Sequence, residues 1–256
     1  MKVVILAGGL GTRLGEITDV KPKPMVEIGG RPVLWHVMKT YAHYGFTEFV
    51  IALGYKSAAI KDYFINYRYR ANSLKVSLRS GSIGVVDDDC EDWTVHLLDT
   101  GKDTMTGGRI KRAAEYIGDE TFMLTYGDGV ANLNISEAAA FHRRHGKLAT
   151  VTAVRPPPRF GGITLDDNLV THFVEKPLTD MGWINGGFFI LEPAVANYIN
   201  GDATTFELEP LEQLAKEEQL MAFRHYEFWQ CMDTINDMRH LENLWTTGRA
   251  PWKVWK

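Results

Sequence analysis

The sequence is poor in cysteine, nearly balanced in charge and free of long apolar runs. Its two cysteines, Cys90 and Cys231, are too few for a disulfide framework and lack metal-site spacing, so we expect a reducing, cytoplasmic setting. A net charge of -4 argues against nucleic acid or an anionic membrane as the main partner. The N-terminal apolar stretch ends at Gly8, which is too short to predict a signal peptide or a membrane span.

Two widespread nucleotide-binding motifs are missing as well. After the apolar run 3–6 the chain reads G-G-L-G-T-R-L over residues 8–14, with Leu14 where a dinucleotide fingerprint has its third glycine. The next expected strand, 48–53, runs into Gly54 without an acidic residue for a ribose. No G-K-[ST] sequence follows the glycines, which excludes a P-loop. A Rossmann dehydrogenase is therefore disfavoured.

What the chain does contain is a glycine-rich loop with positive charges near it. Three glycines let the backbone lie close to a ligand, and consecutive N–H groups in such a turn form an anion-binding nest beside Arg13. Residues 21–25 read K-P-K-P-M, and the two prolines fix φ on either side of Lys23. The glycines alone are equally consistent with a tight turn that binds nothing. Together the two segments predict a site for the phosphates of a nucleotide.

These two segments resemble the sugar nucleotidyltransferase family, whose pattern is L-A-G-G-x-G-T-R-L followed by P-K-P-M. The resemblance implies that the glycine loop wraps a nucleoside triphosphate. It also implies that Arg13 and Lys23 bind the phosphates that leave as pyrophosphate.

The order of patterns along the chain predicts an α/β fold. Short β-rich apolar runs alternate with helical periodicities, which indicates a largely parallel sheet. With the resemblance, we expect a Rossmann-like three-layer α/β/α arrangement around a central mixed, mostly parallel sheet, of the nucleotide-diphospho-sugar transferase type. We expect a single nucleotidyltransferase domain over residues 1–256. The expected strands are 2–7, 48–53, 122–125, 149–154, 170–175 and 187–191, and the expected helices are 32–44, 136–145 and 235–245.

One segment, residues 66–104, interrupts this alternation. It is polar and rich in turns, with three arginines early and the acidic triplet Asp87, Asp88 and Asp89 later. The triplet resembles the metal-binding D-x-D of a glycosyltransferase but lies at no expected strand end, so we interpret it as a solvated loop. We expect the segment to lie beside the nucleotide site or in an oligomer contact.

Two carboxylates are candidates for holding a metal ion. Asp128 follows the expected strand 122–125, at the end where open α/β sheets bind ligands, although the same residues suit a plain Asp-Gly turn. Asp233 precedes the last helix, where it or Thr234 could equally be the N-cap. Magnesium typically takes one or two carboxylates plus substrate phosphates. In the family that the chain resembles, these two positions are the metal ligands, so the resemblance implies Mg²⁺ at Asp128 and Asp233.

Three further segments suit a sugar phosphate. R-F-G-G at 159–162, F-V-E-K-P at 173–177 and I-N-G-G-F at 184–188 are marked by glycine or by paired charge. A Glu-Lys pair on a surface usually contributes little, so these residues alone specify no site. The same order of segments contacts the sugar in the resembled family, which implies that Lys176 holds the sugar phosphate. The full set of implied sugar contacts is Gly161, Glu175, Lys176, Asn185 and Gly186.

The base is expected to meet residues 103–112, which read D-T-M-T-G-G-R-I-K-R at the start of an expected helix. Other family members have a G-T-A-G-A type sequence here; this chain resembles the glucose-1-phosphate cytidylyltransferase branch, over essentially its whole length. We expect Arg109 to donate hydrogen bonds to O2 and N3 of cytosine. Tyr126 and Trp229 are candidate walls, although core packing explains either alone. The implied nucleotide contacts are Leu6, Ala7, Gly8, Gly9, Gly11, Thr12, Arg13, Lys23, Thr104, Thr106, Arg109 and Gly127.

The reaction implied by this branch is CTP plus α-D-glucose 1-phosphate giving CDP-glucose and pyrophosphate. A phosphate oxygen of the sugar attacks the α-phosphorus in line, and it is already anionic at neutral pH because its second pKa is about 6. Arg13, Lys23 and Lys176 are the implied catalytic charges, and no general base is needed. The alternatives are a UTP or dTTP transferase, a glycosyltransferase of similar fold, and a non-catalytic sugar-nucleotide sensor. The branch also implies a homo-oligomer, namely a hexamer, and a pathway to bacterial surface polysaccharide such as O-antigen.

Overall fold

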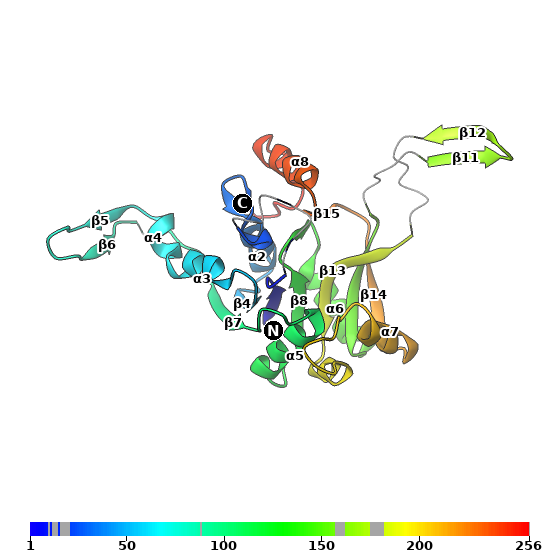
Figure 1. Cartoon of the computed structure of the whole chain (residues 1–256), viewed down its shortest axis with the longest axis horizontal. Coiled ribbons are helices and arrows are strands. Elements are labelled where there is room, and N and C mark those ends of the chain that lie inside the picture. The colour runs from blue at the N-terminus through cyan, green and yellow to red at the C-terminus, as the bar shows by residue number, and fades with distance from the viewer. Residues whose placement is uncertain are drawn as a thin grey trace.

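A seven-stranded sheet forms the centre of the molecule (Figure 1). The computed structural model describes residues 1–9, 11, 15, 21–87, 89–156, 162–174 and 182–255. The strand order in the sheet is β14-β10-β13-β8-β1-β4-β7. Its strands are β1 (Val3–Leu6), β4 (Glu48–Leu53), β7 (Thr94–Asp99), β8 (Phe122–Tyr126), β10 (Ala149–Val154), β13 (Ile184–Leu191) and β14 (Leu220–His225).

Strand β1 lies inside this sheet and is buried over its whole length. Strands β4 and β8 pair with it in parallel, one on each side. A parallel strand that is buried on both faces reads as a continuous apolar run, which is how the sequence reveals it. Strand β13 runs antiparallel to both β8 and β10. The sheet is therefore mixed and mostly parallel, and the expected fold class is confirmed.

Helices cover both faces of the sheet. Alternate residues of β1 point to opposite faces, so that Val3 and Ile5 belong to one apolar core and Val4 and Leu6 to the other. The three expected helices are present as α2, α6 and α8. The first core takes α2 (Val33–His43), α3 (Ser57–Ile65), α6 (Ile135–His145) and α8 (Ile235–Thr246); the second takes α5 (Thr106–Ile117), α7 (Glu209–Lys216) and the 3-10 helix Pro193–Tyr198.

Two hairpins project from this body on different sides (Figure 1). The first comprises β5 (Leu74–Val76) and β6 (Ile83–Val85) and follows the short helix α4 (Tyr67–Ala71); the second pairs β11 (Gly162–Asp166) with β12 (Leu169–Val174). The strand expected at 170–175 is thus present as β12, but it belongs to this hairpin and not to the central sheet. The excursion expected at 66–104 also differs, because its last strand, β7, is an edge strand of the sheet.

Two short ladders lie outside the main sheet and the two projecting hairpins. Strand β9 (Gly129–Ala131), just after β8, pairs antiparallel with β15 (Trp229–Cys231), just before α8. Strands β2 (Glu27–Ile28) and β3 (Arg31–Pro32) form a small hairpin before α2. The β9–β15 ladder matters most for function, because it holds the end of β8 beside the start of α8. No helix in the described part of the chain is long and apolar enough to cross a membrane.

The aromatic residues near the C-terminus pack onto the chain's own core. Trp252 is fully buried and stacks between Phe228 and Trp245. Its Nε1 donates to Nδ1 of His36 at 3.3 Å, while Nε2 of His36 donates to the carbonyl of Ile28 at 2.8 Å. Burial lowers the pKa of His36 to about 4. The imidazole is therefore neutral at physiological pH and serves as a polar link inside an aromatic cluster.

Candidate active site

A cavity of about 630 Å³ opens at the carboxyl ends of β1 and β8. Ligands of open α/β sheets bind at this edge. Thr12 and Arg13 lie outside the described residues. All the other residues that the sequence predicts to contact the nucleotide line this cavity, although their contacts with a nucleotide stay predictions: Leu6, Ala7, Gly8, Gly9, Gly11, Lys23, Thr104, Thr106, Arg109 and Gly127.

A second cavity, of about 270 Å³, lies next to the first. The predicted sugar residues Asn185 and Gly186 line it, and Trp229 forms part of its wall, with Nε1 donating to the carbonyl of Gly186 at 2.7 Å. Asn185 accepts a hydrogen bond from the backbone N–H of Gly187 at 2.8 Å, which orients its side chain. The remaining predicted sugar residues lie outside the described part of the chain: Gly161, Glu175 and Lys176.

The two cavities meet at Tyr126, Asp128 and Asp233, which line both. Asp128 follows β8, whereas Asp233 lies far along the sequence between β15 and α8. The β9–β15 ladder brings them together, and the backbone N–H of Met232 donates to the carbonyl of Asp128 at 2.9 Å. The two predicted metal aspartates therefore stand at the boundary between the predicted nucleotide and sugar sites.

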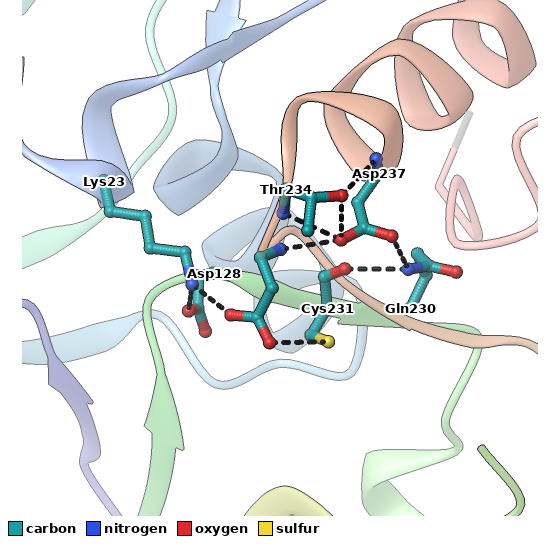
Figure 2. A network of polar contacts seen from close by, with 7 residues as sticks. Lys23, Asp128, Gln230, Cys231, Thr234 and Asp237 are labelled. Atoms are coloured by element: carbon teal, nitrogen blue, oxygen red, sulfur yellow. Dashed lines mark hydrogen bonds and ion pairs between the residues drawn. The ribbon is translucent and has the colours of Figure 1, made fainter. Parts of the chain in front are cut away.

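Lys23 bridges these two aspartates (Figure 2). Its Nζ lies 2.6 Å from Oδ1 of Asp233 and also pairs with Oδ2 of Asp128. The Lys23 side chain is 13% exposed and lines the larger of the two cavities but not the smaller. Burial alone would lower the pKa of Lys23, but attraction to Asp128 and hydrogen bonds to both carboxylates outweigh it, so the pKa is raised. The ammonium is charged at any physiological pH.

The backbone around Lys23 is fixed by its neighbours. Lys23 begins the short 3-10 helix Lys23–Met25, with Pro22 extended before it at φ -64° and ψ 147°. Pro24 and Met25 are buried, while Lys23 itself reaches the cavity. The sequence-based interpretation of an amine held in place by two prolines agrees with this arrangement, but the two carboxylates it contacts were not part of that interpretation.

A capping box at the start of α8 is formed by Thr234 and Asp237, while the neighbouring Asp233 lines the cavity. Thr234 is the N-cap, and its hydroxyl accepts the backbone N–H of Asp237 while the Asp237 carboxylate accepts the backbone N–H of Thr234 (Figure 2). The same carboxylate accepts the backbone N–H of Asp233 at 3.1 Å and Nε2 of Gln230 at 3.1 Å. Of the two N-cap candidates in the sequence, Thr234 takes the structural role.

Cys231 lies beside the carboxylate of Asp233, and its thiol donates to Oδ2 of Asp233, with Sγ 3.6 Å away. Burial, together with the charges of Asp233 and Asp128, raises the pKa of the Cys231 thiol to about 12. A thiol held neutral in this way is a poor nucleophile. Its contribution here is one hydrogen bond to a carboxylate.

The donor set at this junction fits a magnesium ion that is completed by a substrate. Asp128 and Asp233 point their oxygens at one cationic point, now filled by the Lys23 ammonium. Magnesium is commonly held by one or two carboxylates together with substrate phosphates. Within the described ranges, no group of three or more His, Cys, Asp or Glu side chains is placed to hold a metal ion. Among the described residues, the carboxylate pair alone supplies too few ligands to complete the coordination of a metal ion, so an ion bound there would need further ligands from a substrate.

Arg109 lines the larger cavity, and oxygens of the protein itself hold its guanidinium. It is 4% exposed, and its two terminal nitrogens donate to oxygens at the ends of neighbouring strands. Its packing is so close that a Cβ on either Gly8 or Gly54 would lie 2.3 Å from Nη1. The acceptors, 2.7 to 3.2 Å away, are the carbonyls of Gly8, Leu53, Gly101 and Lys102 and the hydroxyl of Thr100.

The expected hydrogen bonds from Arg109 to O2 and N3 of cytosine stay a prediction. Oxygens of the protein already engage both terminal nitrogens, so O2 and N3 of a base would have to compete with them. The side chain does line the cavity. Its established work in the structure is to tie the glycine loop to the ends of β4 and β7.

The glycine pair at the start of α5 also serves packing. A Cβ on Gly107 would lie 2.6 Å from the carbonyl oxygen of Thr204, and one on Gly108 would lie 2.6 Å from Cα of Asp202. The backbone N–H of Gly107 donates to that same carbonyl of Thr204 at 2.9 Å. The pair therefore allows the loop before α7 to approach. The expected approach of a base or an anion to these glycines stays a prediction.

Glu207 supports two residues that line the cavities, and the sequence did not predict it. Its carboxylate accepts the hydroxyl of Tyr126, from the junction of the cavities, and the hydroxyl of Thr106 at 2.6 Å, from the base segment. Thr106 in turn accepts the backbone N–H of Phe206 at 2.9 Å. Glu207 stands in no recognisable motif, so no sequence signal pointed to it. Lys102, which also lines the larger cavity, lies just outside the expected base segment 103–112 and was not predicted either.

The sequence matches the family described as "Nucleotidyl transferase" over residues 2–245. The chain belongs to this family. A glucose-1-phosphate cytidylyltransferase of Salmonella typhi is 53% identical over 257 residues, with 100% of both chains covered. A protein of Bacillus subtilis named "Probable glucose-1-phosphate cytidylyltransferase" is 46% identical over 256 residues, again with 100% of both chains covered. The resemblance to sugar nucleotidyltransferases, and to the cytidylyltransferase branch, is confirmed.

Solved structures of nucleotidyltransferases have the same fold as this family member. HddC from Yersinia pseudotuberculosis is 26% identical with a TM-score of 0.67, and the match covers 95% of this chain and 99% of that one. A putative glucose-1-phosphate thymidylyltransferase from Bacillus anthracis is 18% identical with a TM-score of 0.69, covering 100% and 98%. At this identity the second match supports the fold alone.

Proposed function

We propose that the chain is a glucose-1-phosphate cytidylyltransferase, which makes CDP-glucose and pyrophosphate from CTP and α-D-glucose 1-phosphate. The observation that carries the proposal is that two cavities meet at one carboxylate pair, with a lysine between the carboxylates. One cavity is lined by the glycine loop and the other by Asn185 and Gly186. Full-length relatives with this activity in their names support the choice of substrates.

The proposed reaction is a direct displacement at the α-phosphorus. Glucose 1-phosphate in the smaller cavity presents a phosphate oxygen that is already anionic, because its second pKa is about 6. Catalysis then consists of holding two anions together and neutralising the charge that develops as pyrophosphate departs. Lys23 lies on the nucleotide side of the junction and can meet the leaving phosphates. We propose the same kind of role for Arg13, and for Lys176 on the sugar phosphate.

Asp128 and Asp233 are proposed to hold Mg²⁺, which supplies positive charge to the phosphates when bound. The proposal is supported by the convergence of both carboxylates on one cationic point. Cys231 and the Asp237 capping box hold Asp233 in this orientation. No residue at the junction needs to act as a base, and the neutral Cys231 thiol is not required as a nucleophile.

The proposed place for cytosine is the part of the larger cavity lined by residues 102–106 and by Arg109. Arg109 shapes this wall through its bonds to the carbonyls of Gly101 and Lys102. We propose that Arg109 contacts cytosine and also positions the other residues of this wall that would contact the base. A transferase for UTP or dTTP is the alternative, because the junction itself contains nothing specific to one base.

One assay separates these readings and tests the function. Purified protein is incubated with Mg²⁺, glucose 1-phosphate and each of CTP, UTP, dTTP and ATP, and pyrophosphate release is measured with and without the sugar phosphate. We expect release that requires both substrates and is fastest with CTP. Equal rates with UTP would reduce the proposal to a sugar-1-phosphate nucleotidyltransferase. Binding of CDP-glucose without any turnover would favour a sensor, and glycosyl transfer from a nucleotide sugar would favour a glycosyltransferase.

We also propose that the chain forms a homo-oligomer, a hexamer if it follows the cytidylyltransferase branch, in the bacterial cytoplasm on a route to surface polysaccharide. The hairpin β5–β6 supports self-association, because its apolar side chains are exposed: Leu74, Val76, Leu78, Ile83 and Val86. An isolated two-stranded hairpin is only marginally stable in water, so it needs cover. Sedimentation velocity should show an oligomer for the wild type and smaller species for Leu78→Ser combined with Val76→Ser. A monomeric wild type would contradict this.

A further inference from the structure

The Lys23 ammonium occupies the point where a divalent cation is expected. Nζ lies 2.6 Å from Oδ1 of Asp233 and pairs with Oδ2 of Asp128, so both carboxylates already share a positive charge. The three side chains are 13%, 21% and 24% exposed for Lys23, Asp233 and Asp128. Water therefore reaches them only in part, and the attraction between them is less screened than on an open surface.

A free divalent cation would have to compete with this lysine. Its arrival would place a double positive charge next to an ammonium in the same partly buried pocket, where like charges repel. The ammonium would then have to leave the carboxylates for another anion. Among the described residues, no cluster of three or more metal-ligating side chains offers the cation further ligands that would offset this repulsion. Metal alone is therefore expected to bind poorly.

A nucleoside triphosphate would give Lys23 another ionic partner and would give the metal ion further ligands. Lys23 lines the larger cavity, where we place the phosphates, and can transfer its Nζ to a phosphate oxygen without losing an ionic partner. The same phosphates supply the ligands that the carboxylate pair lacks. The exchange requires only a side-chain motion, because Lys23 has a flexible four-carbon stem while Pro22 and the buried Pro24 hold its backbone.

We propose that Lys23 is an internal counter-ion that excludes free divalent metal from Asp128 and Asp233 and releases the pair when a triphosphate enters. Metal binding thereby becomes conditional on nucleotide binding. This inference rests on the proposed function, because it places a divalent cation and a triphosphate at this junction. Its test nevertheless needs no turnover, since the key quantity is metal affinity in protein without nucleotide.

The experiment titrates Mn²⁺ into nucleotide-free full-length protein and follows free Mn²⁺ by electron paramagnetic resonance. Lys23→Met removes the charge at nearly constant size, and we expect it to bind Mn²⁺ at the junction at least about tenfold more tightly than the wild type, which corresponds to about 1.4 kcal/mol. The matched control is Lys21→Met, from the same K-P-K-P segment. Lys21 is half exposed and pairs with Glu27, so this variant should bind Mn²⁺ as the wild type does.

Three further measurements decide the interpretation. Asp233→Asn in the Lys23→Met background should abolish the gained site, and a gain that persists would place the metal elsewhere and overturn the inference. Lys23→Gln, which keeps a hydrogen-bond donor between the carboxylates, provides the same comparison if Lys23→Met does not fold. Equal Mn²⁺ affinity in the wild type and both Lys23 variants would overturn the inference, as would tight Mn²⁺ binding by the nucleotide-free wild type.

The outcome is separable from that of the proposed function. Pyrophosphate release from CTP by the wild type, combined with unchanged Mn²⁺ affinity in the Lys23 variants, would remove the counter-ion role and leave the enzyme assignment intact. If Lys23→Met binds Mn²⁺ more tightly but the wild type turns over no nucleotide, the counter-ion role stands and the enzyme assignment is removed.

Discussion

Lys23 and Arg109 both line the larger cavity, and the structure holds these two cations in opposite ways. Lys23 is bound by two carboxylates that themselves face the cavity, whereas the terminal nitrogens of Arg109 are bound mainly by backbone carbonyls at the ends of strands. The carboxylates can accept another cation in place of the lysine. The carbonyls are fixed in the backbone and would lose their hydrogen-bond donor if the arginine moved away. The comparison teaches that a charge next to a ligand site can be exchangeable or structural, according to what binds it.

The first and largest expected effect is on the exchangeable side. Asp128→Asn and Asp233→Asn should each abolish Mg²⁺-dependent pyrophosphate release, because each removes one of the two charges that converge on the junction. The matched control is Asp89→Asn, at an exposed position in the acidic triplet, which should leave the rate unchanged. Asp88, the middle residue of that triplet, lies outside the described residues, and we expect the same of it. An essential triplet and a dispensable Asp233 would favour the glycosyltransferase alternative.

Lys23→Ala should reduce kcat by about 10² to 10³, the usual scale for losing one group that stabilises charge in a transition state. The fold should survive, because the side chain faces the cavity while its proline neighbours hold the backbone. Steady-state kinetics and circular dichroism on the same preparation measure both. Near-normal turnover in the folded variant would remove Lys23 from the phosphate site and with it one half of the comparison.

His36 extends the comparison to a titratable group that burial keeps neutral. Burial lowers its pKa from 6.5 to about 4, so between these values the unfolded chain binds a proton that the folded chain does not. The free energy of unfolding should therefore fall as the pH is lowered from 6.5 to 4, by about 3 kcal/mol from this residue. Urea unfolding across this pH range measures the slope, and His36→Gln should flatten it. Parallel curves for the two proteins would contradict the account.

The smallest effect is expected on the structural side. Arg109→Lys keeps the charge but loses the planar fork, which leaves buried carbonyls unpaired at a cost of about 1–3 kcal/mol in unfolding free energy. If the cavity wall that Arg109 positions contacts cytosine, the ratio of the rate with CTP to the rate with UTP should also fall, by about tenfold. Arg112→Lys, on the same helix but pairing with Asp202 at the surface, is the control and should change neither. A melting temperature of Arg109→Lys equal to that of the wild type would show that Arg109 is not structural, and the contrast with Lys23 would fail.

The sequence predicted the parts of the fold that are buried on both sides. Strands β4 and β10 have the predicted bounds, because a strand inside a sheet needs apolar residues at successive positions. Strands β7 and β14 were missed because they form the two edges of the sheet, where half-exposed positions dilute the pattern. For the strand now seen as β12, the pattern was right, but a strand pattern carries no information about which partner it pairs with.

The candidate site divides in the same way. The glycine loop, Lys23 and the two aspartates were predictable because short motifs of fixed spacing carry them. The Lys23–Asp233 contact joins residues 210 positions apart and depends on the β9–β15 ladder, so it required the structure. The role of Arg109 could not be predicted either, because its acceptors are backbone carbonyls, which every sequence contains. Glu207 belongs to no motif and became visible only through the hydroxyls of Tyr126 and Thr106.

The central claim is that two substrates react directly across the junction of the two cavities. Exchange of labelled pyrophosphate into CTP, measured with and without glucose 1-phosphate in the presence of Mg²⁺, tests it most directly. The account predicts exchange only when the sugar phosphate is present, because no group of the protein takes the nucleotidyl moiety. Exchange without the sugar phosphate would reveal a covalent enzyme intermediate and contradict direct attack. No exchange under either condition would contradict nucleotidyl transfer itself.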